Sequence, residues 1–479
     1  METTSAEFPR LSREALARPT LQRALEGVRR TMPAVRAAAL SELPGFAQLR
    51  ERARDIRERT LVELERHLLE FERHALAAGG EVHWARTAEE ACAIIGGICE
   101  RAGARSVIKS KSMVTEEIGL NDDLGRRGLR VTETDLGEYI IQLRAERPSH
   151  ILAPALHLSL AEVGETFVRS HSRARSEPLT TAEQMLREAR EELRAVFRSA
   201  DVGITGANFL VAETGGAVIV TNEGNADLTA SLPGTHIVVT GIEKVVPTLD
   251  DVGVLLRVLA RSAIGEPLSS YTTLVHGPRR PADASGPSRF HVVLVDNGRS
   301  HLLGTPLQDI LRCIRCSACL NHCPVYTAVG GHAYGSVYSG PMGAVLTPAL
   351  AGLAVTAHLP NASTLCGRCE AVCPVAIPLP KLLRHWRERA LAEGLASGRE
   401  RRGLSLWRWL AAHPWVYRMA LAMAARVLRS ISIPAGSAGR RRIRRLPVGG
   451  GWTAWRDMPA PEGETFQERW RRRAGTAAS

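Results

Sequence analysis

The sequence has no apolar run long enough for a transmembrane helix, and its first residues lack the basic start and apolar core of a secretory signal peptide. These absences predict a cytoplasmic protein. It also has no G-x-G-x-x-G motif placed between a strand and a helix, so a dinucleotide site of that type has no support. The length of 479 residues allows two or three domains, each with its own core.

Cysteine is scarce, yet seven of the nine cysteines lie between Cys313 and Cys373. The first run is a C-x2-C-x2-C-x3-C-P pattern, Cys313-Ile-Arg-Cys316-Ser-Ala-Cys319-Leu-Asn-His-Cys323-Pro324. The second run is Cys366-Gly-Arg-Cys369-Glu-Ala-Val-Cys373-Pro374, with Ser363 where its first cysteine would stand. The other two cysteines, Cys92 and Cys99, lie on a predicted helix among isoleucines, and we interpret them as buried small residues.

The two runs match the pattern in which three thiolates of one run bind a four-iron cluster and the fourth cysteine, before proline, binds the other cluster. We therefore expect two ligand sets, Cys313, Cys316, Cys319 and Cys373 for cluster one, and Cys323, Cys366 and Cys369 for cluster two. The fourth iron of cluster two then takes the Ser363 hydroxyl, water or an outside ligand, or is missing in a three-iron cluster. The sequence leaves these alternatives open.

Zinc sites and disulfides are the other uses of such cysteines. Zinc needs neither the third cysteine of the first run nor a proline after both runs, so iron–sulfur clusters are favoured. Disulfides are disfavoured because a long chain without an export signal is expected in a reducing compartment.

Short apolar strands alternate with helices between about residues 80 and 300, which predicts a mostly parallel sheet covered by helices. The predicted strands are 82–85, 106–109, 129–132, 151–153, 209–212, 217–221, 237–240, 272–275 and 292–295. The later strands lie close together, which favours hairpins with a turn at Gly215-Gly216. Before this region, a long amphipathic helix begins at Gln48 and ends at Gly79-Gly80.

Three loop regions of this domain carry polar side chains. They are 109–117, which contains two lysines and three hydroxyls, then 133–138, and then 203–208 together with 213–216 and 221–225. Ligands of open α/β sheets lie at the carboxyl ends of strands, where such loops gather, although ordinary turn chemistry also explains each loop. If the domain is itself catalytic, Lys109 or Lys111 would hold a substrate carboxylate and Glu138 or Glu213 would act as acid or base.

The net charge of +12 is concentrated at the C-terminal end, because the residues from Lys381 onward hold 21 Lys and Arg against 7 Asp and Glu. Seven of the eight tryptophans lie there as well. A predicted helix at 415–429 places Arg418, Arg426 and Arg429 opposite an apolar face. Such a helix suits an anionic membrane surface or a partner protein, and a solvated tail that packs its tryptophans on the cysteine region is the alternative. No recognised nucleic-acid-binding motif accompanies the charge, so we expect no nucleic-acid partner.

Several segments together resemble the lactate-utilisation protein B family. They are the two cysteine runs, the glycine-rich segment 330–343 between them, Lys109-Ser-Lys-Ser-Met113, the segment 133–142, and Pro148-Ser-His-Ile151. The resemblance implies an iron–sulfur protein with two four-iron clusters that works with two companion proteins in oxidising L-lactate to pyruvate. It also implies an α/β fold related to sugar-isomerase and CoA-transferase sheets, and a helical ferredoxin-type cluster region.

We expect four parts: a helical N-terminal segment at 1–79, an α/β domain at 80–300, a helical ferredoxin-type two-cluster domain at 301–385, and a basic tryptophan-rich region at 386–479. The leading interpretation is an electron-transfer subunit that passes electrons through two [4Fe-4S] clusters to a downstream acceptor. Four residues between the ligands are candidates for tuning the clusters, namely Arg315, Asn321, His322 and Arg368. The alternatives are a catalytic α/β domain acting on a 2-hydroxy acid, and a scaffold whose clusters are structural.

Overall fold

A computed structural model describes residues 3–171, 178–435, 440–446, 450, 453 and 456–476. The chain divides into two units, Met1–Leu395 and Ala396–Ser479. The first unit holds the two larger sheets and all seven clustered cysteines, and the second holds most of the basic C-terminal region. Each unit is described by itself.

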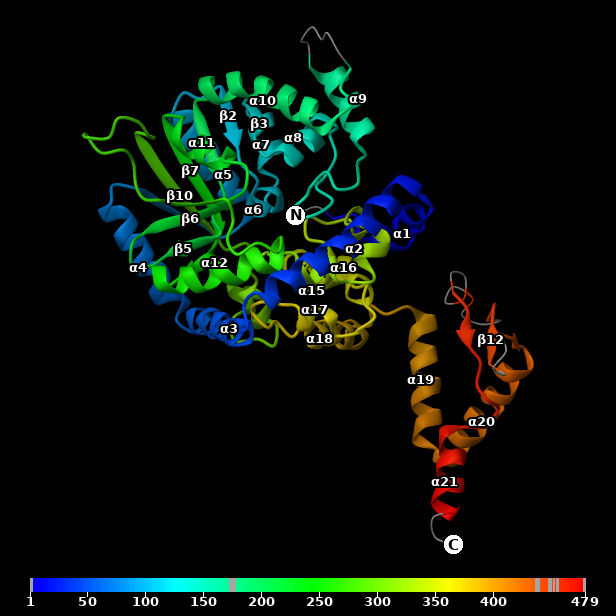
Figure 1. Ribbon diagram of the computed structural model, residues 1–479. Helices are drawn as coiled ribbons and strands as arrows, with labels where there is room; N and C mark the ends of the chain where they lie inside the picture. Colours follow the sequence, from blue (N-terminus) through cyan, green and yellow to red (C-terminus); the bar gives the residue numbers. More distant parts are fainter. Residues whose placement is uncertain are drawn as a thin grey trace. The chain divides into compact units, whose positions relative to one another are not determined.

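The main sheet of the first unit has six strands, all parallel, in the order β1-β10-β7-β4-β2-β3 (Figure 1). Their bounds are β1 Glu81–Ala85, β2 Ser106–Lys109, β3 Arg130–Glu133, β4 Val202–Thr205, β7 Thr235–Gly241 and β10 Arg289–Val295. The central strands are apolar and buried on both faces, which is the usual state of a parallel sheet covered by other elements. The predicted parallel α/β sheet is therefore confirmed.

Helices and a second sheet cover the two faces of the main sheet. On one face, Ile95 and Leu120 pack against Val107, Ile204 and Val239. On the other face, leucines of α4 and residues of the second sheet form a separate core with strands β7 and β10. The helices of this domain are α5 Ala88–Arg101, α6 Met113–Glu117, α7 Leu120–Arg126, α8 Leu136–Leu143, α9 Leu160–Ser170, α10 Ala182–Ser199, α11 Asn225–Ser231 and α12 Leu249–Ala263.

The second sheet has the order β8-β5-β6-β9, with β8 Val245–Val246, β5 Phe209–Val211, β6 Gly216–Thr221 and β9 Tyr271–Val275. Strands β5 and β6 pair antiparallel, with Val211 opposite Gly216. Gly215 has a φ of +70°, a backbone conformation that glycine adopts without strain. The predicted hairpin turn at Gly215-Gly216 is confirmed.

Three predicted elements differ from the structure. The predicted strand 151–153 is wrong, because the backbone N–H groups of Leu152 and Ala153 donate to the His150 ring instead of to a neighbouring strand. The predicted loop 203–208 is wrong in its first three residues, which belong to strand β4, and Gly203 is needed there, since a Cβ would collide with the carbonyl oxygen of Thr229. The long helix predicted from Gln48 is divided at Glu63.

The division of that helix follows its packing. The first half, α3 Phe46–Val62, buries Ala53 and Ile56 in the core that also contains the cysteine region. The second half, α4 Leu64–Ala77, buries Leu68 and Phe71 against the two sheets. A break between the halves lets one amphipathic sequence reach two cores.

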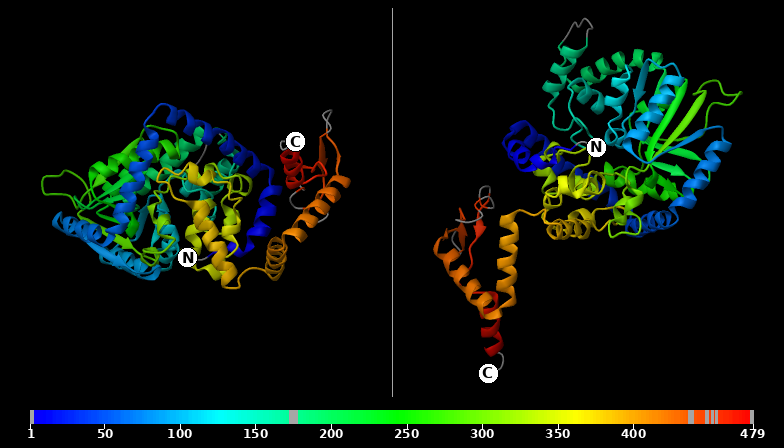
Figure 2. Two further views of the ribbon diagram at one scale, coloured as in Figure 1. Left: turned by 90° about the horizontal axis from the view of Figure 1, so that it is seen from below. Right: turned by 180° about the vertical axis from the view of Figure 1, so that it is seen from behind.

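Short helices form the cysteine region, and the N-terminal helices lie beside it in both views of Figure 2. The helices of the cysteine region are α13 Ala318–Asn321, α14 Tyr326–Val329, α15 Gly340–Ala351, α16 Leu353–Thr356, α17 Arg368–Ala371 and α18 Leu379–Ala392, and the first two N-terminal helices are α1 Phe8–Ala17 and α2 Pro19–Ser41. Trp386 of α18 is buried, and its ring N–H donates to the carbonyl of Val345. Trp386 is thus part of the core of the first unit and not an exposed tail tryptophan.

The second unit contains α19 Gly398–Ala412, α20 Pro414–Ser430, α21 Phe466–Thr476 and a small antiparallel sheet of β11 Ile433–Pro434, β12 Arg441–Ile443 and β13 Met458–Pro459. The predicted helix at 415–429 is confirmed as α20. Trp452 and Trp455 lie outside the described residues. None of the described helices is both long and apolar enough to cross a membrane.

Candidate iron–sulfur site

The first cysteine run follows a short 3-10 helix, Gln308–Arg312, and wraps tightly around a small hollow. Arg315 and Ser317 have φ values of +59° and +56°, which are uncommon for residues other than glycine. These two left-handed residues turn the chain between the cysteines. The hollow is lined by the thiol-bearing residues Cys313, Cys316, Cys319 and Cys373. Cys373 comes from the second run, so the structure brings together the four residues that the sequence assigns to cluster one.

The three remaining cysteines form a second group. Burial and the nearby charges of Cys323 and Cys366 raise the pKa of Cys369 to about 12. Cys366 is exposed, and its pKa is lowered because the backbone N–H of Arg368 donates to it. Ser363 stands at the position of the missing cysteine, where its hydroxyl accepts the N–H of Leu365 at 3.1 Å.

Two buried hydroxyls near these groups have no hydrogen-bond partner within the described part of the chain. One is Ser317 in the loop of the first run, and the other is Tyr334, which is fully buried. Cys323 and Cys319 lie close enough to Tyr334 to raise the pKa of its phenol, although burial contributes more. Unused donors next to thiol groups fit an iron–sulfur cluster, whose sulfur atoms accept hydrogen bonds. The residues present therefore fit the group that the cysteine pattern implies.

The glycine-rich segment between the two runs packs against the α/β domain. A Cβ at Gly331 would collide with the carbonyl oxygen of Ser149. Tyr338 is fully buried, and its hydroxyl donates to Glu117 at 2.6 Å. His332 is at the surface, and its ring Nε2 donates to the carbonyl of Arg147 at 2.7 Å. The backbone of this segment therefore packs closely against the α/β domain, and Tyr338 is a packing residue.

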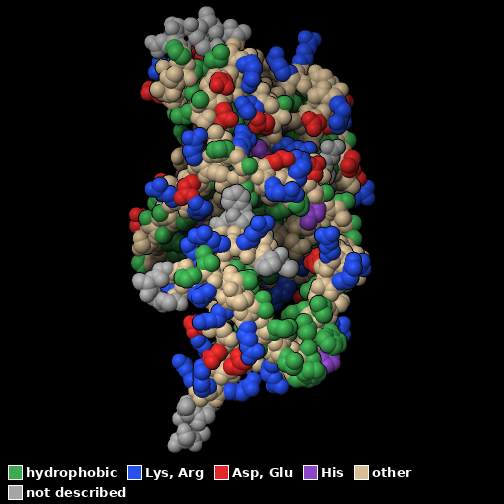
Figure 3. Space-filling model, turned by 90° about the vertical axis from the view of Figure 1, so that its right-hand side faces the viewer, with side chains coloured by type: hydrophobic (Ala, Val, Ile, Leu, Met, Phe, Trp, Pro, Cys, Tyr) green, Lys and Arg blue, Asp and Glu red, His purple; other side chains and the backbone are tan. Residues whose placement is uncertain are grey.

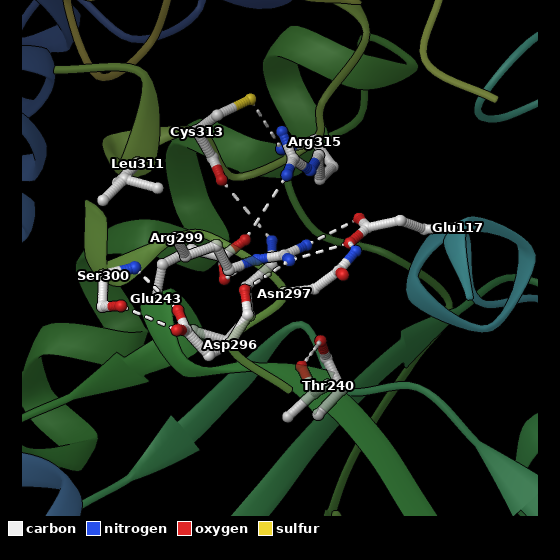
Figure 4. A network of polar contacts seen from close by, with 12 residues as sticks. Glu117, Thr240, Glu243, Asp296, Asn297, Arg299, Ser300, Leu311, Cys313 and Arg315 are labelled. Carbon is white, nitrogen blue, oxygen red and sulfur yellow. Dashed lines mark hydrogen bonds and ion pairs between the residues drawn. The ribbon is translucent and has the colours of Figure 1, made fainter. Parts of the chain in front are cut away.

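A buried network of charges joins the α/β domain to the first cysteine run (Figure 4). Arg299 lies 2.7 Å from Glu117 of α6 and 2.7 Å from Glu243, which belongs to the 3-10 helix Ile242–Lys244 after β7. Glu243 in turn lies 3.4 Å from Arg315, one of the two residues between Cys313 and Cys316. Burial alone would raise the pKa of Glu243, but Arg299 and Arg315 outweigh it and lower the pKa to about 2. The network holds Arg315 in place beside the cysteines.

The four candidate catalytic residues lie in three different places. Lys109 is fully buried, 2.8 Å from Glu133 and 3.0 Å from Glu116, and Glu138 is buried near the same group. Glu213 accepts the N–H of Leu249 at the start of α12. Of the four, Lys111 alone is among the residues that line a cavity in this domain.

That cavity has a volume of about 270 Å³ and is bounded by residues from all three polar loops. Three of the lining residues belong to the predicted polar loops, namely Ser110, Asp135 and Asn208. A fourth lining residue, Arg315, is a predicted tuning residue. Lys244 was missed. The signal for Lys244 is a pair of charged residues, Glu243-Lys244, shortly after a strand with an apolar centre, where ligand-binding loops of α/β proteins lie.

Three family models match the chain: the LUD domain over residues 68–295, the 4Fe-4S dicluster domain over residues 309–377, and the C-terminal region of lactate utilisation protein B over residues 380–475. Lactate utilization protein B of Geobacillus thermodenitrificans is 42% identical over 99% of this chain and 98% of its own length. The protein of that name from Bacillus velezensis is 41% identical over 98% and 97%. An uncharacterized electron transport protein of Escherichia coli, YkgF, is 40% identical over 98% and 97%.

A LUD domain followed by a 4Fe-4S dicluster domain defines the chain as an iron–sulfur protein. The chain belongs to the lactate utilisation protein B family. Among solved structures, a DUF162 family protein from Deinococcus radiodurans is 19% identical over 48% of this chain and 98% of its own, with a TM-score of 0.25. That likeness is too weak to support the predicted relation to sugar-isomerase and CoA-transferase folds.

Proposed function

We propose that this protein is an electron-transfer subunit that accepts electrons from the oxidation of L-lactate to pyruvate and passes them on through two [4Fe-4S] clusters. The observation that carries the proposal is the hollow lined by Cys313, Cys316, Cys319 and, from the other run, Cys373. Exchange of the fourth cysteine between two runs is the ligand pattern of two-cluster ferredoxins. Cys323, Cys366 and Cys369 hold the second cluster, together with a fourth group other than cysteine or with one iron fewer.

When bound, each cluster supplies a one-electron redox couple. The chain contributes backbone N–H groups that point at the thiol sulfurs. Ile377 donates to Cys373 at 3.3 Å, Arg315 to Cys313 at 3.5 Å, and Tyr326 to Cys323 at 3.5 Å. Hydrogen bonds to sulfur and nearby positive charge stabilise the more negative, reduced state and raise the reduction potential.

Lactate alone is expected to leave the purified protein oxidised, because the sequence contains no recognisable flavin or nicotinamide site and the companion proteins supply the oxidation step. The test is the visible absorbance of the anaerobic protein. Dithionite should bleach it, L-lactate alone should not, and L-lactate with the companion proteins should.

Two results would contradict this proposal. If the purified protein reduces a dye with lactate at full rate, the α/β domain is itself the catalyst. If a redox titration finds no accessible couple, the clusters are structural and the protein is a scaffold.

We also propose that the second unit attaches the protein to an anionic membrane surface. Exposed apolar side chains are concentrated on α19 and α20, namely Leu404, Leu406, Trp407, Trp409, Trp415, Met419, Met423 and Val427. Figure 3 shows a patch of hydrophobic side chains with a histidine at its edge and basic side chains nearby. Exposed tryptophans beside arginines suit the headgroup region of an anionic bilayer, where each basic residue contributes about 1 kcal/mol.

Vesicle binding should therefore be strong for anionic lipid, weak for neutral lipid, and reduced as salt rises, because salt screens the attraction. Replacing both Trp407 and Trp415 with serine should weaken binding about tenfold or more, since each exposed ring contributes apolar area. Trp84→Ser is the control, because Trp84 is an exposed tryptophan of the other unit. The membrane proposal would be overturned if the protein did not bind vesicles at any salt concentration and the second unit were required only for binding the companion proteins.

A further inference from the structure

The cavity of about 270 Å³ in the α/β domain lies against the first cysteine run. Its wall includes Arg315, from between Cys313 and Cys316, and Lys244, whose ammonium donates to the carbonyl of Cys313. The volume is near the lower end of small-molecule sites, which are commonly about 300–1,000 Å³. Its polar residues follow the carboxyl ends of strands such as β2 and β7, where α/β proteins bind their ligands.

Two basic side chains at the cysteine end of the cavity, the buried Lys244 and the partly buried Arg315, have spare hydrogen-bonding capacity. Burial and the nearby Arg315 lower the pKa of Lys244 to about 7, and a bound carboxylate would favour its ammonium form. Lys244 is 6% exposed, and in the described part of the chain its ammonium makes one hydrogen bond, 3.4 Å long, to the Cys313 carbonyl. An ammonium has three donors, so two are unused. The guanidinium of Arg315 has only long contacts with side-chain acceptors among the described residues, 3.4 Å to Glu243 and 3.5 Å to the sulfur of Met342. A carboxylate accepts short, charge-assisted bonds from such groups.

The other residues of the cavity wall limit the negative charge of the ligand and favour a ligand that carries a hydroxyl group. The ammonium of Lys111 already donates to the carbonyl of Leu152 at 2.8 Å and lies 3.8 Å from the carboxylate of Asp135. Asp135 and Glu223 add negative charge to the wall, which disfavours a dianionic phosphate. Ser110, Ser112 and the two acids can accept a hydrogen bond from a ligand hydroxyl.

We propose that this cavity binds a small monocarboxylate of the 2-hydroxy acid class, with its carboxylate held by Lys244 and Arg315. The choice of 2-hydroxy acids rests on the proposed function, whereas the carboxylate site rests on the cavity itself. Lys244 contacts the first cysteine run and Arg315 belongs to it. The negative charge of an anion bound between them would therefore act on cluster one. Negative charge there opposes reduction, so the ligand should lower the reduction potential of cluster one and leave that of cluster two nearly unchanged.

Isothermal titration calorimetry on the anaerobic holoprotein tests the proposal, with L-lactate, its neutral amide and inorganic phosphate as probes. L-Lactate should bind saturably, and the amide and phosphate should bind at least about tenfold more weakly, because a charge-assisted hydrogen bond contributes more than a neutral one. Lys244→Met should weaken lactate binding by about tenfold or more for the same reason. Lys381→Met is the matched control, since Lys381 is an exposed lysine of α18 outside the cavity, and it should bind lactate normally.

Iron and sulfide are measured on every sample, and an EPR-monitored titration with and without lactate gives the potential of each cluster. The titration of the unsubstituted protein keeps the test valid if Lys244→Met does not fold. The cavity proposal is overturned by no saturable lactate binding up to about 10 mM, well above common substrate constants, by equal binding of the amide, or by preferential binding of phosphate. Absence of iron and sulfide would instead overturn the proposed function, and lactate binding would still be measured independently.

Discussion

Cys316→Ser should remove cluster one and leave cluster two in place. Cys316 is 8% exposed and shares its hollow with three other cysteines, so no neighbouring thiol is free to replace it. A serine hydroxyl is far less acidic than a thiol and is a poor ligand for iron–sulfur clusters. The expected result is a fall from about seven or eight iron atoms per chain to about three or four, with the EPR signal of cluster two retained.

Cys99→Ala is the matched control for that experiment. Cys99 is fully buried in α5 among apolar residues and lies outside both runs, as its predicted packing role requires. It should keep the iron content of the unsubstituted protein. Loss of both signals in Cys316→Ser, with normal folding, would contradict separate clusters with the proposed ligand sets.

Arg299→Met should lower the free energy of unfolding of the first unit by about 3–5 kcal/mol, because it leaves the buried Glu117 without a positive partner and takes from Glu243 the nearer of its two arginines. All three side chains are almost completely buried. Arg86→Ala is the control, since the Arg86–Glu90 ion pair is at the surface, where solvent screens it, and its loss should change the stability little. Denaturant unfolding followed by tryptophan fluorescence and by circular dichroism measures the difference. Equal small effects for both variants would show that the network does not hold the domain and the cysteine run together.

The same network predicts a loss of stability in acid. The folded pKa of Glu243 is about 2, below its ordinary value of 4.5. A carboxylate with a depressed pKa stabilises the fold at pH values above its ordinary pKa, and this contribution is lost as the pH falls from about 4.5 towards about 2.

Much of the fold could be predicted because it depends on local patterns. Strand β2 was predicted with its observed bounds, and the Gly215-Gly216 turn follows from its sequence. The errors arose where distant contacts decide the structure. The predicted loop at 203–208 begins as strand β4, where Gly203 packs against the carbonyl of Thr229. The strand predicted at 151–153 is absent because the backbone N–H groups of Leu152 and Ala153 donate to the His150 imidazole.

The candidate site divides in the same way. Grouping of Cys373 with the first run follows from spacing and could be predicted. The different surroundings of Lys109 and Lys111 could not be predicted, although the two lysines are only two positions apart. Lys109 is buried in ion pairs with glutamates, whereas Lys111 lines a cavity. The signal for Lys244 is two charged residues after a strand, which becomes specific only when the fold places them beside Cys313.

Metal and sulfide analysis of the anaerobically purified protein, combined with a redox titration, tests the two-cluster account most directly. We expect about seven or eight iron atoms with a similar amount of acid-labile sulfide per chain, and two separable one-electron couples. Zinc without sulfide, bound by the same cysteines, would contradict the account.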